Sequence, residues 1–408
     1  MSKTEMPSIR FRGFEDAWEQ RKLGEMGQTY TGLSGKTKDD FGHGQARFVT
    51  YMNVFSNPIS NPEMTEPIEI DPKQNEVEVG DVFFTTSSET PEEVGMSSIL
   101  LEKRGKTYLN SFCFGFRPSE KIDSYYLAYM LRSESTRVKI ILLAQGISRY
   151  NISKNKVMEI AVSLPSLDEQ KMIGQYFSQL DHLITLHQRK FEKLTNVKKS
   201  MLEKMFPRNG SCYPEIRFKG FTAPWEQRKF GEITSKYEDP VPTPHDGYYR
   251  LGIRSHAKGT FHSYVAKGQE LETAQMHRVA AGNFIVNITF GWEHAVAITD
   301  KNDAGKLVSH RFPQFSFAEG MVPEFFRYVI VDEKFRHHLW LASPGGAGRN
   351  RVLKLDEMLN YLMRFPSRDE QIKIAEFFRQ LDNLITLHQR ELEKLQSIKK
   401  ELLEKMFV

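Results

Sequence analysis

The sequence predicts an α+β protein in which two mixed domains are each followed by a long helix, so that the chain is an internal repeat. The first observation is that residues 165–206 recur in closely similar form at 366–407. The second is that residues 8–26 recur at 215–233. The third is that strand-like runs precede helix-like runs between these repeats, which is the order of an α+β domain. The expected domains are 1–164 and 209–365, and the expected helical segments are 165–208 and 366–408.

Each repeated helical segment is predicted to be one amphipathic helix. Apolar residues fall three and four apart along Ile173–Met201 and again along Ile374–Leu402. This spacing keeps one apolar stripe on one face of a helix. Ser166 and Ser367 precede acidic residues and are the predicted N-caps, while lysines fill the last turns. Two helices with matched stripes are expected to pack on each other as a coiled coil.

His187 and His388 fall at the same phase of the two stripes, where the other residues are apolar. They are interpreted as a polar layer that sets the register of the coiled coil. A metal site is the alternative, and it is disfavoured because no cysteine or acidic ligand set accompanies the histidines.

The composition is that of a globular protein with room for two or three domains. The chain has 408 residues, of which 39% are hydrophobic and 26% charged, and its net charge of +4 permits nucleic-acid binding without requiring it. The two cysteines, Cys113 and Cys212, lie in unlike contexts, which predicts neither a disulfide framework nor a zinc site. No apolar signal segment or membrane-length run occurs, so no membrane association and a cytoplasmic location are expected.

In the first domain, β-branched and aromatic runs predict strands at 47–55, 77–86 and 108–118. A helix is predicted at 125–144. The second domain has the same plan. Its strands are predicted at 248–254 and 282–290, and its helix at 323–342.

Three catalytic or nucleotide-binding motifs are only imitated. Gly32–Thr37 resembles a phosphate-binding loop, but Tyr30 stands where the first glycine is required. Phe41–Gly44 is an equally weak match to a glycine-rich methyl-donor loop, and no Asn-Pro-Pro-aromatic tetrapeptide occurs. Glu169-Gln170-Lys171 imitates half of a nuclease motif. It lies on the first turn of the predicted helix, and the second copy replaces the lysine, so helix capping explains it better.

Polar and basic loops are the candidate ligand-binding segments. Arginine forks and amides are the groups that read base edges or bind phosphates, and neighbouring glycines allow close approach of the backbone. Each segment is also compatible with an ordinary solvated turn or an exposed strand face. The candidate nucleic-acid-binding residues are Thr86, Ser87, Ser88, Arg149, Tyr150, Asn151, Lys154, Arg250, Arg254, Lys258, Arg349, Asn350 and Arg351.

The two repeated openings and the two repeated helical segments together resemble those of the specificity subunits of Type I restriction-modification systems. The resemblance rests on the openings WEQRKLGE and WEQRKFGE, the helix entries LPSLDEQ and FPSRDEQ, and the helix ends LEKMF, and it covers almost the whole chain. It implies two target-recognition domains separated by an antiparallel coiled coil of the two helices, related by a pseudo-two-fold repeat. Each domain would read one half of an asymmetric bipartite site in double-stranded DNA.

The resemblance also implies partners. Two methyltransferase subunits would carry S-adenosylmethionine and modify adenine N6, and restriction subunits would use ATP and Mg²⁺. This chain would then be a non-catalytic recognition subunit without a cofactor of its own. Two other classes are weighed against it. A standalone methyltransferase or nuclease would act alone. A protein-binding scaffold or an inhibitor of restriction would bind all DNA sequences equally when assembled.

Overall fold

The computed structural model describes residues 6–208, 210–270, 273, 275–345 and 351–408. The chain divides into two compact units. Unit 1 comprises Met1–Lys190 and His388–Val408, and unit 2 comprises Phe191–Leu387. The two long helices are α5 (Leu167–Lys204) and α9 (Arg368–Lys405). Each unit therefore contains a part of both helices.

Unit 1 has an α+β fold. Its elements before α5 are β1 (Glu19–Lys22), η1 (Leu23–Glu25), β2 (Gly27–Thr31), η2 (Lys38–Asp40), β3 (Phe41–Val49), α1 (Tyr51–Ser56), β4 (Thr65–Ile68), β5 (Val82–Thr85), β6 (Ser87–Ser88), η3 (Pro91–Glu93), β7 (Ser97–Ile99), β8 (Thr107–Leu109), β9 (Cys113–Pro118), α2 (Ser124–Met130), α3 (Glu134–Ile141), β10 (Tyr150–Asn151), α4 (Lys154–Met158) and β11 (Ala161–Leu164).

Two sheets form the body of unit 1. One is antiparallel with the order β2-β9-β5-β7, and the other has the order β4-β3-β8 with β3 and β8 parallel. Strand β5 is buried along its whole length. Val82 and Phe84 pack in the main core, whereas Phe83 between them packs in a second cluster. This alternation follows from the two-residue period of a strand and shows that both faces of the sheet are covered.

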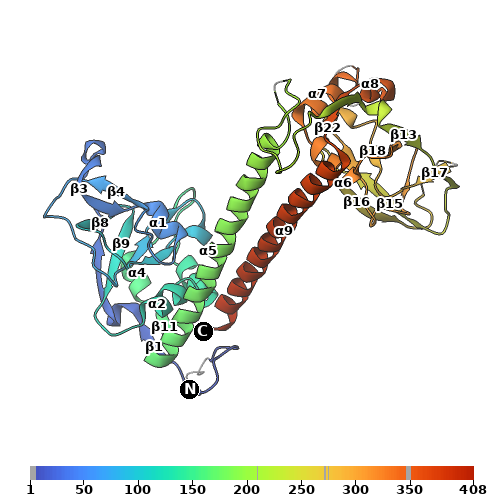
Figure 1. Cartoon of the computed structure of the whole chain (residues 1–408). Coiled ribbons are helices and arrows are strands. Elements are labelled where there is room, and N and C mark those ends of the chain that lie inside the picture. The colour runs from blue at the N-terminus through green and yellow to red at the C-terminus, as the bar shows by residue number, and fades with distance from the viewer. Residues whose placement is uncertain (1–5, 209, 271–272, 274, 346–350) are drawn as a thin grey trace. The chain divides into compact units, whose positions relative to one another are not determined.

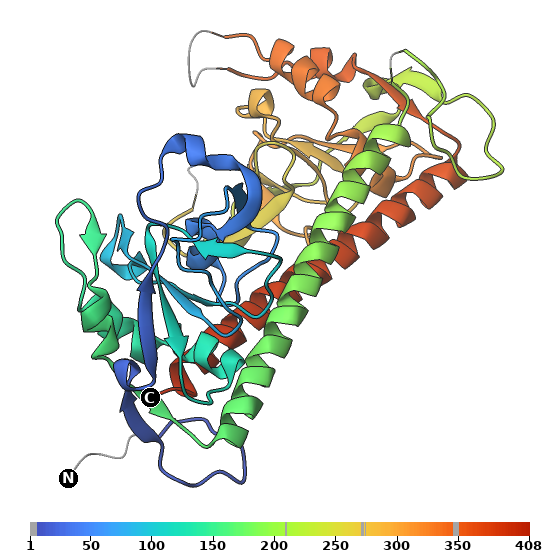
Figure 2. The ribbon, with the colours of Figure 1, turned by 90° about the vertical axis from the view of Figure 1, so that its left-hand side faces the viewer.

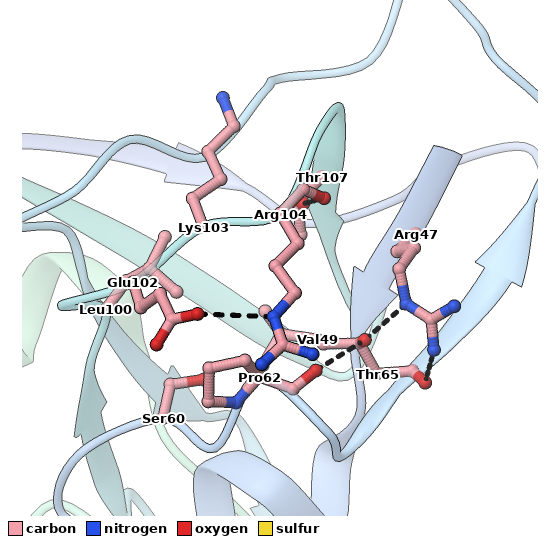
Figure 3. Close-up of a pocket in the computed structure, with 10 residues that line it drawn as sticks. All are labelled: Arg47, Val49, Ser60, Pro62, Thr65, Leu100, Glu102, Lys103, Arg104 and Thr107. Carbon is pink, nitrogen blue, oxygen red and sulfur yellow. Dashed lines mark hydrogen bonds and ion pairs between the residues drawn. The ribbon is translucent and has the colours of Figure 1, made fainter. Parts of the chain in front are cut away.

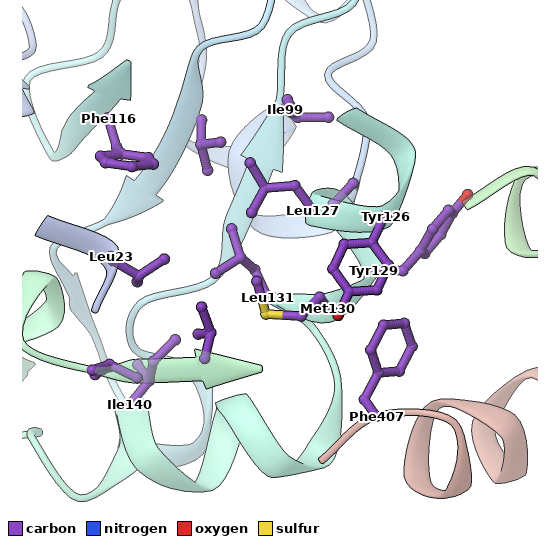
Figure 4. Packing of buried hydrophobic residues seen from close by; sticks show 14 of the residues in the cluster. Leu23, Ile99, Phe116, Tyr126, Leu127, Tyr129, Met130, Leu131, Ile140 and Phe407 are labelled. Atoms are coloured by element: carbon purple, nitrogen blue, oxygen red, sulfur yellow. The ribbon is translucent and has the colours of Figure 1, made fainter. Parts of the chain in front are cut away.

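The main core of unit 1 contains residues from both ends of the chain (Figure 4). Helix α2 packs along α5, and the rings of Tyr129 and Phe177 are 5.2 Å apart (Figure 1). Phe407, just beyond the end of α9, lies in the same cluster. Its ring centroid is 5.6 Å from those of Tyr126 and Phe177. The C-terminal residues of the chain are therefore part of the core of its N-terminal domain.

Unit 2 repeats this plan. Its elements before α9 are β12 (Glu226–Lys229), η4 (Phe230–Glu232), β13 (Thr234–Tyr237), β14 (Pro240–Pro242), β15 (Tyr248–Ile253), β16 (Thr260–Val265), β17 (Gln275–Arg278), β18 (Phe284–Val286), η5 (Gly291–Glu293), β19 (Val296–Ile298), β20 (Leu307–Val308), β21 (Gln314–Phe317), α6 (Pro323–Val329), α7 (Glu333–Leu341), α8 (Leu355–Leu359) and β22 (Leu362–Phe365).

The sheets of unit 2 match those of unit 1 in order. Strands β13-β21-β18-β19 correspond to β2-β9-β5-β7. The second sheet is larger, with the order β14-β17-β20-β15-β16, and its parallel pair β15 and β20 corresponds to β3 and β8. The predicted α+β class and internal repeat are confirmed. The extra strands β14 and β17 are a difference that the sequence repeat did not reveal.

Several predicted element boundaries were wrong. The strand predicted at 47–55 ends at Val49, because Thr50 accepts a hydrogen bond from the Asn53 amide and starts helix α1. The strand predicted at 77–86 is confined to β5, and the one at 282–290 is confined to β18. Each helix predicted at 125–144 and 323–342 is two short helices, with Ser133 or Asp332 capping the second one.

The two long helices run antiparallel, as contacts within each unit show. In unit 1, Lys399 Nζ lies 2.5 Å from a carboxylate oxygen of Asp181, and the Tyr129 hydroxyl donates to the other oxygen over 2.9 Å. The early part of α5 thus faces the late part of α9 (Figure 2). Unit 2 has the reverse pairing, since Lys198 contacts Asp382 at 2.5 Å. The predicted coiled coil is confirmed.

The two histidines of the apolar stripes meet in unit 1. Nδ1 of His187 and Nδ1 of His388 are 3.2 Å apart, and the ring centroids are 5.1 Å apart. Burial, together with the neighbouring His187, lowers the pKa of His388. The predicted interhelical polar layer is confirmed. Among the described residues, no group of three or more potential metal ligands occurs.

The capping interpretation of Glu169 was incomplete. Ser166 Oγ does accept from the Glu169 amide, over 3.4 Å, but the Glu169 carboxylate binds Arg10 in a bidentate pair with distances of 2.7 and 2.8 Å. Gln170 accepts from the Asp123 amide and donates to the Pro165 carbonyl. The repeated Glu-Gln pair therefore fastens the helix start to two other segments of unit 1. None of the described helices has an apolar stretch long enough to cross a membrane.

Candidate nucleic-acid interface

A tight hairpin presents one group of candidate residues in unit 1. The backbones of Gln145 and Asn151 exchange two hydrogen bonds of 2.9 Å, which closes the loop between them. Gly146 has a φ of 148°, and a Cβ there would lie 2.0 Å from the Arg149 carbonyl oxygen. Only glycine fits this position. Ile147 and Arg149 are therefore held, exposed, at the tip of a defined turn.

Strand pairing brings the two candidate loops of unit 1 together. Strand β10 pairs antiparallel with β6, so that Tyr150 faces Ser88 and Asn151 faces Ser87. The Ile152 amide continues the pairing by donating to the Thr86 carbonyl over 3.0 Å. Two loops that are distant in the sequence thus form one surface.

The hydroxyl groups of this surface are largely turned inward. Ser87 and Ser88 are each only 8% exposed. Thr86 Oγ1 donates to the Phe112 carbonyl over 2.9 Å, and Ser88 Oγ donates to Glu93 over 3.2 Å. These residues support the hairpin. The groups available to a ligand are on the exposed Arg149 and Asn151, while Lys154 starts helix α4 beside them and is partly buried.

A partly buried arginine that the sequence analysis missed anchors the segment that follows β6. The Arg137 guanidinium donates to the carbonyls of Gly95, Glu92 and Val94 over 2.7, 2.8 and 2.7 Å. Burial lowers the pKa of Arg137 to about 10, so that the side chain remains a cation at neutral pH. No local sequence pattern signals this role, because the three carbonyls lie more than 40 residues earlier in the chain.

In unit 2, the candidates Arg254 and Lys258 lie on the turn between β15 and β16. The Arg254 amide donates to the Gly259 carbonyl over 2.9 Å, and the guanidinium donates to the Thr260 carbonyl. Arg254 Cζ also lies 5.3 Å from the centroid of the Phe261 ring. Lys258 is exposed at the turn. Arg250 lies four residues earlier on β15 and is partly buried.

This turn packs directly on η5. Ser255 Oγ donates to the Glu293 carboxylate over 2.6 Å, and the His256 amide donates to the Glu293 carbonyl over 2.9 Å. The Ala257 amide donates to the His294 carbonyl over 2.8 Å. The structure therefore brings Arg254 and Lys258 next to the loop that follows β18.

Arg351 reaches the same loop from the other side. Its Cζ lies 5.8 Å from the Trp292 ring centroid and 5.1 Å from that of Trp340. Two residues later, the Leu353 amide donates to the Ile288 carbonyl over 2.9 Å. This bond corresponds to the one from Ile152 to Thr86 in unit 1, so Arg351 holds the place of Tyr150. The candidates Arg349 and Asn350 lie outside the described residues.

Sequence analysis missed the aromatic residues of this surface. Phe290 and Trp340 are each 45% exposed, and Trp292 is partly buried beneath Arg351. Phe290 was assigned to the preceding strand, although Gly291 immediately after it signals a turn. Exposed aromatic side chains beside arginines are typical of nucleic-acid-binding surfaces.

A small cavity in unit 1 is not a ligand site. It lies between Arg47, Thr65 and Arg104, and Arg47 donates two hydrogen bonds of 2.5 Å to Thr65 across its edge (Figure 3). Its volume of about 10 Å³ is roughly that of a single water molecule. A nucleotide or methyl donor would not fit there.

Each of the two units thus presents loops with arginines, which are residues that can bind nucleic acid. Comparison with known proteins indicates one family. Residues 15–196 match the family model described as the Type I restriction modification DNA specificity domain. Two Methanocaldococcus jannaschii proteins are similar. One, assigned as the MjaX type I restriction enzyme specificity subunit, is 22% identical over 98% of this chain and 94% of its own length. The other, the MjaVIII type I specificity subunit, is 25% identical over 75% of this chain and 74% of its own.

The fold also matches a solved structure, the Type I restriction-modification S subunit from M. genitalium. The TM-score is 0.60 with 12% sequence identity, and the match covers 99% of both chains. Residues 15–196 of the present chain thus match a Type I specificity domain, and almost the whole chain is similar to a Type I specificity subunit. These descriptions name DNA specificity, which agrees with the expectation of a recognition subunit.

Proposed function

We propose that this specificity subunit reads an asymmetric, bipartite DNA site, with one half-site for each of two target-recognition domains. The domains are residues 1–164 and 209–365, and residues 165–208 and 366–408 are the spacer helices. The observation that carries the proposal is that two units of one sheet order present different residues at matching positions. Tyr150 in unit 1 corresponds to Arg351 in unit 2. Because the two units present different DNA-contacting residues on one scaffold, the two half-sites are expected to differ in sequence.

The candidate residues divide by role in this proposal. Arg149, Asn151 and Lys154 in unit 1, and Arg254, Lys258 and Arg351 in unit 2, contact bases or phosphates. Tyr150 contacts DNA beside them, while Thr86, Ser87 and Ser88 support the hairpin and Arg250 lies farther along the strand. Arg349 and Asn350 are included from their residue types and position in the sequence.

The chemistry is assigned to partner subunits. In the proposed complex, two methyltransferase subunits bind S-adenosylmethionine and methylate adenine N6, and restriction subunits use ATP and Mg²⁺. The complex acts in the cytoplasm. This chain determines the DNA sequence on which the complex acts.

Exposed leucines of the repeated helices support docking of two copies of one partner. Leu183 and Leu186 are exposed in unit 1, and Leu384 and Leu387 are exposed in unit 2. They occupy the same positions of the identical heptapeptide LITLHQR. Packing within the chain does not explain why exposed side chains are identical in the two copies of this heptapeptide. An identical apolar pair on each copy is therefore explained by one kind of partner that binds twice, and we assign it to the methyltransferase subunit.

Replacing Leu183 and Leu186 by glutamine is expected to weaken binding of one methyltransferase subunit about 10-fold or more, because the contact loses two apolar side chains. Glutamine keeps the helix propensity, so the fold should be retained. The measurement is the number of methyltransferase subunits per specificity subunit by native mass spectrometry. Val79→Ser, which alters another exposed apolar residue of unit 1, is the control. An unchanged stoichiometry and affinity would exclude these leucines from the interface.

The test of the proposed function is base-resolved mapping of N6-methyladenine in cells that contain the chain with its methyltransferase partner. Methylation is expected at one split, asymmetric motif, and it should disappear from that motif when the chain is removed. Exchange of unit 2 for that of a relative should change one half of the motif only. Methylation that is independent of this chain would refute the proposal.

A further inference from the structure

Arg351 in unit 2 lies over the rings of two tryptophans. Its guanidinium carbon lies 5.8 Å from the ring centroid of Trp292 and 5.1 Å from that of Trp340. Trp292 belongs to η5 and Trp340 to α7, and the Leu353 amide anchors the backbone next to them by donating to Ile288 over 2.9 Å. Two separate elements thus contact one arginine side chain, and a main-chain bond anchors the backbone two residues from it.

The hydrogen-bonding edge of this guanidinium is unused within the described part of the chain. Among the described residues, the Arg351 side chain interacts with the Trp292 and Trp340 rings and has no hydrogen-bond acceptor or ion-pair partner. Stacking on aromatic rings uses the faces of the guanidinium and leaves its N–H groups directed outward. The other stacked arginine of this surface differs, because Arg254 donates to the Thr260 carbonyl.

We infer that Arg351 reads a guanine in the half-site recognised by unit 2, an inference that rests on the proposed function. Guanine presents two acceptors, N7 and O6, on its major-groove edge, and the two parallel donors of an arginine match them. Adenine presents one acceptor and one donor there, and cytosine presents a donor. An arginine has no acceptor for those donors. Among the four bases, guanine is the one that pairs fully with Arg351.

Stacking on two rings favours a base over a phosphate as the ligand of Arg351. Phosphate contacts tolerate a mobile point charge, such as the exposed Lys258 on the neighbouring turn. A planar fork that is fixed before binding loses little conformational freedom when it forms a bidentate contact. The matching residue of unit 1 is Tyr150, whose hydroxyl provides a single donor. The contact therefore belongs to one half of the target only.

The test compares Arg351→Gln with wild type in the complete complex, by base-resolved mapping of N6-methyladenine across genomic DNA. One position of one half-site should be guanine for the wild type. The variant is expected to lower the preference for guanine at that position about 10- to 100-fold and to leave all other positions unchanged. Arg336→Gln is the matched control, since Arg336 lies on α7 but is exposed and paired with Glu333 at 2.5 Å.

Further variants separate base reading from a structural role. Arg351→Lys keeps a cation over the rings but removes the fork, and it should relax the same position without lowering the melting temperature. Trp292→Leu should relax it partly, and Trp292→Phe should restore it. Uniformly weaker methylation with guanine still required would assign Arg351 to a phosphate and overturn the inference, as would a target without guanine in the affected half. A wild-type complex without any sequence preference would instead refute the proposed function.

Discussion

Replacement of Phe407 by alanine is expected to destabilise unit 1, which contains the N-terminal domain, by about 3–5 kcal/mol. Phe407 is 4% exposed, and its ring packs against Tyr126 of α2 and Phe177 of α5 at centroid distances of 5.6 Å. Alanine would leave a cavity between three elements. Rigid helices and a sheet that is covered on both faces would close such a cavity only partly.

The effect should be confined to one unit. Amide hydrogen exchange of the buried strand β5 is expected to accelerate about 100-fold or more, while that of β18 in unit 2 should stay unchanged. Phe206 is the matched position at the end of α5. Its ring lies 5.7 Å from Trp225 and from Phe325 in unit 2. Phe206→Ala should therefore accelerate exchange in β18 and spare β5.

An equal loss of protection in both units, or in neither, would contradict this assignment of the chain ends. The control for local fraying is Val408→Ala, because Val408 only borders the core. It should have a small effect on either strand.

The two long helices and the internal repeat could be predicted from sequence. A repeated segment and a regular spacing of apolar residues can both be read directly from the sequence. The stripes Ile173–Met201 and Ile374–Leu402 predicted both long helices. The sequence alone could not show that Phe407 completes the core next to Tyr126, since that contact joins residues far apart in the chain. The β-branched and aromatic residues of 47–55 also could not show that a helix starts at Thr50. That start depends on a single hydrogen bond to the Thr50 side chain.

The candidate surface was predictable in part for a similar reason. Residue type marked Arg149, Asn151 and Arg351 as groups that can bind nucleic acid. Burial decides which of the neighbouring residues can do so, and Ser87 and Ser88 become buried only when β6 pairs with β10. The role of Trp340 depends on Arg351 lying over its ring, a contact that no local pattern contains.

Arg10→Met is expected to destabilise unit 1 by about 3–5 kcal/mol, because it leaves a buried carboxylate without its counter-ion. The Glu169 side chain is 1% exposed, and Arg10 binds it in a bidentate pair with distances of 2.7 and 2.8 Å. Hydrogen bonding to Glu169 raises the pKa of Arg10, which agrees with a tight pair. The measurement is the free energy of unfolding of unit 1, from hydrogen exchange of β5.

A second variant tests whether the unpaired charge causes the loss of stability. The double variant Arg10→Met with Glu169→Leu removes the charge and should recover much of the lost stability at neutral pH.

Arg217 and Glu370 form the same pair in unit 2, with two contacts of 2.7 Å. Arg217→Met should therefore destabilise unit 2 and spare β5. A loss below about 1 kcal/mol, which is typical of an exposed ion pair, would contradict this prediction. The Arg10–Glu169 pair would then orient the N-terminal segment without stabilising unit 1, and the repeated Asp-Glu-Gln motif would need another explanation.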